Sequence, residues 1–226
     1  MKRRHKIVLA VVTAKALGAA YLFLALPRLR RWGATAEEVS RTLPGDDLIA
    51  RPLYTTTHAI TVRAPAADVW PWLVQIGQNR GGFYTYDALE NIAGLKVRSA
   101  DRIHPEWQDL RAGEDYLTLD PDETMKMTIA VFEPPHAFVV RSGAPGEAPQ
   151  EAGNFFRGEL AWTWGFYLEP EGTAATRLIV RSRAAWRRTV PTAFARTLML
   201  EPAHFIMEEG MLRGIRDRAE GAAREA

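Results

Sequence analysis

Cysteine is absent from this chain of 226 residues, which excludes disulfide bonds, thiolate metal sites and cysteine nucleophiles. Its absence does not identify a compartment, because a cysteine-free fold works in oxidising and reducing environments alike. Acidic residues are absent from residues 1–31, which hold eight Lys and Arg residues. The other 21 Lys and Arg residues stand against 27 Asp and Glu residues, so the rest of the chain is net −6. An acidic body without a basic stripe argues against nucleic-acid binding.

Long apolar runs are scarce, and residues 7–26 (IVLAVVTAKALGAAYLFLAL) form the clearest one. Twenty helical residues rise about 30 Å, which matches the hydrocarbon core of a bilayer. A central Lys15 costs about 2.5 to 3.5 kcal/mol, which the ten Leu, Ile, Val and Phe residues offset. We therefore expect residues 1–6 to be a basic tail and residues 7–26 a single transmembrane helix. A cleaved signal peptide and a peripheral helix are the alternatives, and nearly equal basic flanks leave the membrane side of the body open.

The remaining residues suit one globular domain rather than two. Hydrophobic residues make up 47% of the chain and charged residues 25%, which is too apolar a composition for a disordered body. Residues 27–56 are predicted to be a linker, in which Thr35 and Glu38 have the spacing of a capping box for a short helix. Residues 57–226 are predicted to be the domain.

Period-two alternation between clusters of Pro, Gly and Asp predicts a run of antiparallel strands. Helical patterns are found at residues 66–76 and 86–93, before most of the strands, and at residues 189–222, after them. The predicted strands are 57–63, 115–119, 125–132, 137–142, 159–168 and 177–183.

Two of these strands have one strongly apolar face. In residues 159–168 every second residue is Leu, Trp or Phe, and in residues 125–132 the face carries Met125, Met127, Ile129 and Val131. A sheet with one apolar face needs a cover. Strand 177–183, by contrast, has three arginines on its other face, which predicts a solvated outer surface paired with acids of a neighbouring strand: Arg177, Arg181 and Arg183.

The cover is the helix predicted over residues 189–222, where apolar residues recur every three, four or seven positions. Pro202 predicts either a kink or the start of a second helix. Gly210 and Gly214 are one turn apart, and we expect them to let the helix approach the sheet closely.

This order of elements resembles the helix-grip arrangement of the START-like, or SRPBCC, superfamily. Several stretches resemble bacterial members described as polyketide cyclase/dehydrase-like: 60–65 (ITVRAP), 69–73 (VWPWL), 81–87 (GGFYTYD), 89–91 (LEN) and 176–178 (TRL). The resemblance covers roughly residues 55–220. It implies an α+β fold with a curved antiparallel sheet packed around a long C-terminal helix, and an internal cavity for lipids, sterols, polyketides or other apolar molecules. It implies no particular reaction, because fold alone does not determine function.

Candidate ligand-binding residues follow from the apolar strand faces, the helix and the tyrosine-rich segment near residue 86. They are Trp162, Trp164, Phe166, Met125, Met127, Tyr84, Tyr86, Glu90, His204, Met207, Glu208 and Met211. Solid core packing is the alternative for each aromatic residue and methionine. His204 and Glu208 are spaced i, i+4, so they could form an acid/base pair or a structural hydrogen bond. Two such side chains do not make a metal site, and no metal or cofactor is predicted.

The leading functional hypothesis is a membrane-anchored binder or carrier of a hydrophobic small molecule, because the predicted interior is rich in aromatic residues and methionine. The alternative is a polyketide cyclase/dehydratase-like enzyme that uses Tyr84, Tyr86, Glu90 or His204 as acid or base. A third possibility is an interaction domain with a filled core.

Overall fold

The computed structural model describes residues 12–13, 15–92, 94–119, 126–142, 160–186 and 196–225. Met125, part of the apolar run 7–26 and part of the predicted helix 189–222 lie outside these residues. Within the described part, no helix combines the length and the apolar character that a membrane crossing needs.

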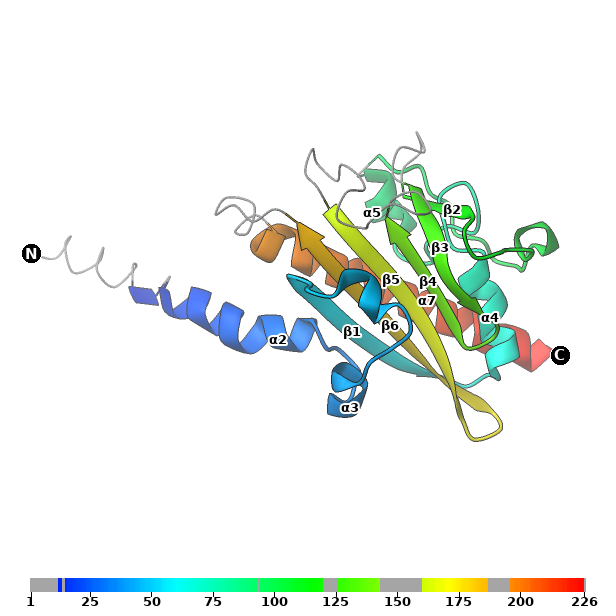
Figure 1. Cartoon of the computed structure of the whole chain (residues 1–226), viewed down its shortest axis with the longest axis horizontal. Coiled ribbons are helices and arrows are strands. Elements are labelled where there is room, and N and C mark those ends of the chain that lie inside the picture. The colour runs from blue at the N-terminus through cyan, green and yellow to red at the C-terminus, as the bar shows by residue number, and fades with distance from the viewer. Residues whose placement is uncertain are drawn as a thin grey trace, which may run out of the picture.

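Six antiparallel strands form one curved sheet, as the sequence predicts (Figure 1). The order across the sheet is β1-β6-β5-β4-β3-β2, so the first and last strands of the chain are neighbours and β1 lies at an edge. The strands are β1 (Tyr54–Val62), β2 (Asp115–Thr118), β3 (Lys126–Glu133), β4 (Ala137–Ser142), β5 (Leu160–Glu171) and β6 (Ala175–Trp186).

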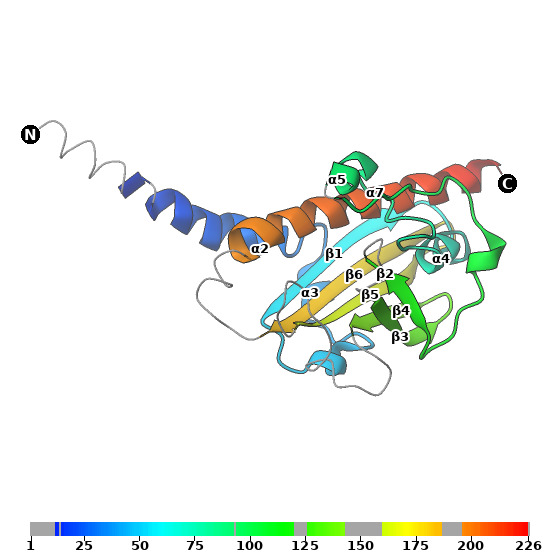
Figure 2. The same ribbon diagram turned by 90° about the horizontal axis from the view of Figure 1, so that it is seen from above.

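The long helix α7 (Glu201–Glu225) runs along one face of the sheet, together with α4 (Ala66–Val74), and α5 (Asp87–Ile92) lies beside α7, farther from the sheet (Figure 2). The main hydrophobic core lies between this face and the helices. Its buried members from the sheet and α7 include Val62, Met127, Ile129, Phe138, Trp164, Phe166, Leu168, Leu178, Val180, Met211, Leu212, Ile215 and Ala219. The α+β class and the helix-covered sheet are therefore present as expected.

Strand β3 departs from the alternation that the sequence suggests. Met127 and Ile129 face the main core, but Val131 packs in a second cluster with Val139 and Tyr167 on the opposite face. The pairing with β4 shifts register between Ile129 and Val131, and such a bulge reverses the faces beyond it. The prediction of one apolar face over all of 125–132 was therefore wrong at Val131.

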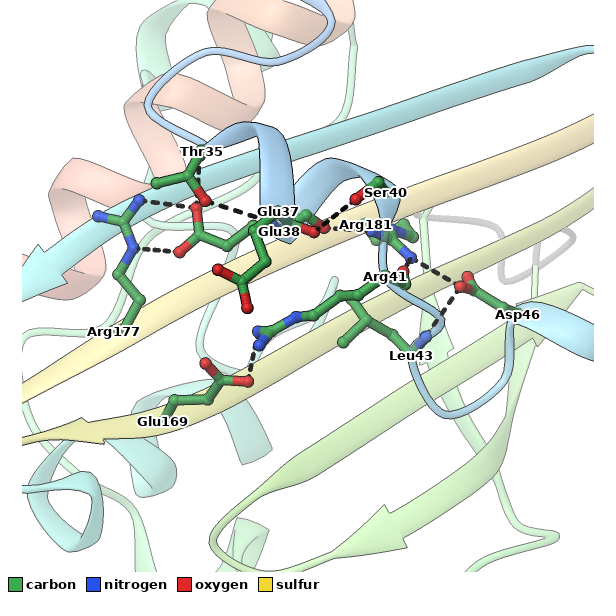
Figure 3. A network of polar contacts seen from close by, with 10 residues as sticks. All are labelled: Thr35, Glu37, Glu38, Ser40, Arg41, Leu43, Asp46, Glu169, Arg177 and Arg181. Atoms are coloured by element: carbon green, nitrogen blue, oxygen red, sulfur yellow. Dashed lines mark hydrogen bonds and ion pairs between the residues drawn. The ribbon is translucent and has the colours of Figure 1, made fainter.

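The opposite face of the sheet is covered by α3 (Ala36–Ser40) and the 3-10 turn η2 (Asp46–Ile49). The predicted capping box at Thr35 and Glu38 is present. Arg181 is buried beneath this segment, where its guanidinium donates to the carbonyls of residues 38, 39 and 41 and pairs with Asp46 at 2.6 Å (Figure 3).

The expectation of a solvated arginine face was therefore wrong. Arg177 pairs with Glu38 at 2.7 Å and Arg183 with Asp46 at 3.2 Å, so the acids come from residues 38 and 46 rather than from a neighbouring strand. Strand periodicity places these arginines correctly on the outer face, but it contains no information about which segment covers that face.

The segment between the N-terminal helix and β1 is packed along the edge of the sheet. The backbone N–H of Thr57 donates to the carbonyl of Arg30 at 2.9 Å, and that of Ala59 donates to Trp32 at 3.1 Å. Strand β1 begins at Tyr54, three residues before the predicted start. The predicted domain boundaries stay predictions. Residues 30–32 occupy part of the exposed edge of β1, and this protects the edge from pairing with another chain.

The long C-terminal helix begins with a π-type turn, η4 (Arg196–Leu200), directly before α7. Pro202 is the second residue of α7, which begins at Glu201 directly after η4. Of the two predicted alternatives, an α-helix beginning next to Pro202 fits this arrangement. Gly210 and Gly214 do permit a close approach, but to Tyr86 and the backbone of Tyr84 rather than to the sheet.

Candidate functional site

A buried ion pair joins the edge strand to the long helix. His58 of β1 and Glu208 of α7 have fully buried side chains, and His58 Nδ1 lies 2.5 Å from Glu208 Oε2. The two atoms are in contact without the alignment of a regular hydrogen bond. On its other side, His58 Nε2 lies 2.7 Å from the carbonyl oxygen of Leu29, at the end of the N-terminal helix. His58 therefore connects three segments that are distant in the sequence.

The charges of this pair stabilise each other. Burial on its own would lower the pKa of His58, but the Glu208 carboxylate and the Leu29 carbonyl outweigh it and raise that pKa. Burial would raise the pKa of Glu208, and the charges of His204 and His58 with the Trp164 hydrogen bond outweigh it and lower that pKa. The pair is consequently an imidazolium and a carboxylate near pH 6.

Glu208 also connects to the aromatic face of β5. Its Oε1 accepts a hydrogen bond of 2.8 Å from Trp164 Nε1 and lies 3.5 Å from the hydroxyl of Ser182 on β6. A carboxylate that receives a ring N–H in a dry interior is held in one orientation. The inward face of β5 therefore presents the N–H group of Trp164, as well as apolar surface, to α7.

His204 lies one turn before Glu208 and is less enclosed, with 25% of its side chain exposed. Its Nε2 is 3.9 Å from Glu208 Oε1, and its Nδ1 is 3.2 Å from the hydroxyl of Tyr54. Burial lowers the pKa of His204, and the charge of His58 lowers it further against the opposing effect of Glu208. His204 is therefore a neutral imidazole near pH 7, which can accept or donate a proton.

An aromatic row leads from this polar group into the core. The rings of Trp162 and Trp164 stack at 5.7 Å between centroids, and Trp164 meets Phe166 at 4.8 Å. Trp162 is half-buried and meets His204 edge-on at 6.3 Å. The row thus has a partly exposed end at Trp162, His204 and Tyr54, and a buried end at Phe166.

The structure brings together four of the predicted site residues, Trp162, Trp164, His204 and Glu208, with Phe166 following in the same row. Met127 and Met211 are buried members of the main core. Met207 lies elsewhere on α7, where its sulfur accepts a hydrogen bond of 3.6 Å from the hydroxyl of Thr85.

The predicted tyrosines lie further along α7. Tyr84 is buried at a positive φ of 56°, with its ring 5.8 Å from Trp72 and 4.8 Å from the Arg218 guanidinium. Tyr86 is largely exposed and lies against Gly210.

Glu90 of α5 is buried, and its Oε2 has no hydrogen-bond partner among the described residues. Burial, with a smaller contribution from the charge of Asp87, raises the pKa of Glu90 to about 7. The polar partners of the His58–Glu208 pair are Leu29, Trp164, Ser182 and His204, and they lie apart from the segment of Glu90 and the two tyrosines in the sequence. The predicted residues therefore fall into two groups on α7 rather than one.

Sequence reasoning missed His58, Tyr54 and Ser182 as members of the site. The signal for His58 was present, because it shares the inward face of β1 with Ile60 and Val62. A histidine on an apolar strand face needs a partner, but the sequence does not identify the partner as Glu208, 150 residues later. The described residues contain no group of three or more His, Asp or Glu side chains placed to hold a metal ion.

No family model matches the chain, and no curated protein matches it in sequence. Solved structures show a remote likeness. A hypothetical protein of Helicobacter pylori is 13% identical with a TM-score of 0.46, over 80% of this chain and 96% of that one. Norcoclaurine synthase from Thalictrum flavum is 14% identical with a TM-score of 0.42, over 83% and 96%. CalU16 from Micromonospora echinospora is 16% identical with a TM-score of 0.34, over 81% and 92%.

Similarities with TM-scores below 0.5 carry no argument about fold, substrate or activity. The chain's own elements carry the fold assignment. A six-stranded antiparallel sheet that curves beneath a long C-terminal helix fits the helix-grip arrangement of START-like proteins.

Proposed function

We propose that this protein binds an apolar or amphipathic small molecule between the sheet and α7, and that its N-terminal segment holds it at a membrane. The observation that supports binding most directly is the row of Trp162, Trp164 and Phe166, which ends at a half-exposed ring beside His204. Ligand sites are typically apolar with a few polar groups that fix orientation. Here those polar groups are His204, Tyr54 and, behind Trp164, Glu208.

The geometry favours a ligand whose apolar part lies against the tryptophans. Its polar end would meet the neutral imidazole of His204 or the hydroxyl of Tyr54, both of which can donate and accept hydrogen bonds. Glu208 is already paired with His58 and Trp164, so its role is to hold Trp164 rather than to bind a cation.

Native mass spectrometry of the full chain, released from mild detergent, tests the proposal. We expect a defined apolar adduct that denaturing extraction recovers, and we expect Trp162→Ala to lose it. Trp107→Ala is the matched control, because Trp107 is also half-buried but stacks on His104 in a separate segment. A clean apo mass in the wild type, or equal adduct in both variants, would contradict binding at this site.

An enzyme acting on a hydrophobic substrate is the second candidate, and one observation favours it. His204 combines a lowered pKa, partial exposure and a hydroxyl partner in Tyr54, which are the properties of a general base. If the protein is an enzyme, the His204→Gln variant should be inactive and should co-purify with the substrate. The wild type should release or retain a product of different mass. The same extracted molecule from both proteins would favour the binder.

A further inference from the structure

Two apolar segments that are far apart in the sequence lie side by side at one end of the molecule. The N-terminal helix, which ends in η1 (Tyr21–Ala25) and α2 (Leu26–Leu29), emerges next to η4, the start of the C-terminal helix (Figures 1 and 2). The Tyr21 hydroxyl donates a hydrogen bond of 2.7 Å to the carbonyl of Thr197. Arg30 donates two hydrogen bonds of 2.8 Å to Glu201, which is 8% exposed, and this pair fixes the base of the arrangement.

The side chains around this junction are apolar and exposed. On the N-terminal helix Leu17, Leu22, Phe23 and Leu24 are between 46% and 77% exposed. On the C-terminal helix the corresponding residues are Leu198, Met199 and Ile206, at 45%, 71% and 47%. Met199 and Ile206 are seven residues apart, so they share one side of the helix two turns apart. Large apolar side chains gathered from two elements are atypical of a surface that faces water.

The charges beside this surface identify what covers it. Lys15, Arg28 and Arg31 are exposed on the N-terminal segment, and residues 1–31 contain no acid. Apolar side chains flanked by Lys and Arg favour the interface of a bilayer that carries anionic head groups. Tyr21 lies five residues before Leu26, the last residue of the apolar run. Thr197, bonded to Tyr21, is therefore at the depth of the apolar run and not beyond its end.

We propose that Leu198, Met199 and Ile206 form a second membrane-docking surface. It enters the leaflet that holds the C-terminal end of the apolar N-terminal helix. The inference rests on the membrane attachment proposed above and extends it from a tether to a fixed orientation. Docking at η4 turns the start of α7 toward the lipid, and His204 lies in that first turn beside Trp162. An amphipathic ligand then passes between bilayer and binding site without crossing water.

The absence of cysteine makes a direct test possible, because a single introduced cysteine accepts a label at one position. Full chains carrying Phe23→Cys, Met199→Cys, Ile206→Cys or Thr173→Cys are labelled with an environment-sensitive nitrobenzoxadiazole dye. They are then reconstituted into phosphatidylcholine and phosphatidylglycerol vesicles. Thr173 is the control, since it is exposed in the turn between β5 and β6 at the far end of the sheet.

We expect the labels at positions 23, 199 and 206 to shift to the blue, to brighten several-fold, and to be quenched by nitroxides on the acyl chains. The label at 173 should remain in water. If the label at 23 is in lipid but the labels at 199 and 206 are exposed to water, the docking surface is overturned and the tether stays intact. If the labels at all four positions are exposed to water, both the tether and the docking surface are overturned.

A charge variant separates docking from mere proximity to the tether. Met199→Glu changes an exposed side chain, so circular dichroism and thermal unfolding should match the wild type. Combined with the labelled cysteine at 206 or 23, Met199→Glu should return the label at 206 to water while the label at 23 stays in lipid. An unchanged label at 206 would show that the apolar side chains of η4 do not carry the docking.

Discussion

His58 holds the end of the N-terminal helix and the buried carboxylate of α7 in one arrangement. Its replacement by Leu removes the positive partner of Glu208 and leaves a charge in a dry interior. Breaking a buried pair in this way costs about 3–5 kcal/mol in the free energy of unfolding. Urea unfolding of His58→Leu should show that loss. The double variant His58→Leu/Glu208→Gln should regain part of it, because Gln keeps an acceptor for Trp164 without a charge. Equal losses in both would mean that the pairing is not electrostatic.

The same pair predicts how stability depends on pH. The pKa of Glu208 is lowered from its ordinary 4.5, so its contribution is complete above that value and is lost as pH falls through the folded-state pKa. The pKa of His58 is raised from 6.5, so its contribution is complete below that value and is lost as pH rises through the folded-state pKa.

The difference in unfolding free energy between wild type and Glu208→Gln should therefore be largest between about pH 4.5 and 6.5, and shrink on both sides. Urea titrations of the two proteins over this range supply the measurement, and the subtraction removes the contribution of all other groups. A difference that grows steadily above pH 7 would show that His58 is neutral in the folded protein.

At the scale of elements, the crossing of α7 by the Tyr84–Tyr86 segment depends on two glycines. A Cβ on Gly214 would overlap the carbonyl oxygen of Tyr84, and one on Gly210 would press on the Tyr86 ring. This crossing, rather than an approach to the sheet, explains why the helix carries glycine despite its low helix propensity.

Gly214→Ala should therefore destabilise the protein by about 1–3 kcal/mol or more, although Ala is the better helix former. Gly221→Ala on the same helix is the matched control, since its Cβ meets nothing within 4 Å, and it should stabilise by up to about 1 kcal/mol. Thermal unfolding of both variants measures the two signs. A stabilised Gly214→Ala would mean that the Tyr84 segment moves away at little cost.

At the scale of the whole molecule, the N-terminal segment packs against the domain and, in the function proposed above, also attaches the protein to a membrane. A shortened chain should begin at Leu26 rather than at Trp32, because Leu29 and Arg30 bind His58 and Glu201. After alkaline carbonate washing, we expect membranes to retain the full chain and to release the chain that begins at Leu26. The wash strips peripheral proteins, so the docking surface at η4 would not hold the shortened form. Release of both forms would contradict an integral anchor.

Much of the fold follows from local pattern. The alternation of β5 and β6, the capping box at Thr35 and the helix at Ala66–Val74 are determined by short-range periodicity and capping chemistry. The candidate site was partly predictable. Trp162 and Trp164 follow the alternation of a strand, and His204 and Glu208 are spaced i, i+4 on the predicted helix. His58 was visible as a polar residue on an apolar face, but no local rule connects it to a partner 150 residues away.

The sequence by itself determined the order of the main strands and helices, the apolar face of the sheet except beyond the bulge in β3, the long helix that covers it and the basic, acid-free N-terminus. Only the tertiary structure decided that His58 pairs with Glu208, that Arg181 is buried under residues 38–46, and that Tyr21 meets Thr197. The physical reason is that propensity and periodicity act over a few residues, whereas the partner of a buried charge depends on which distant segments the folded chain brings together.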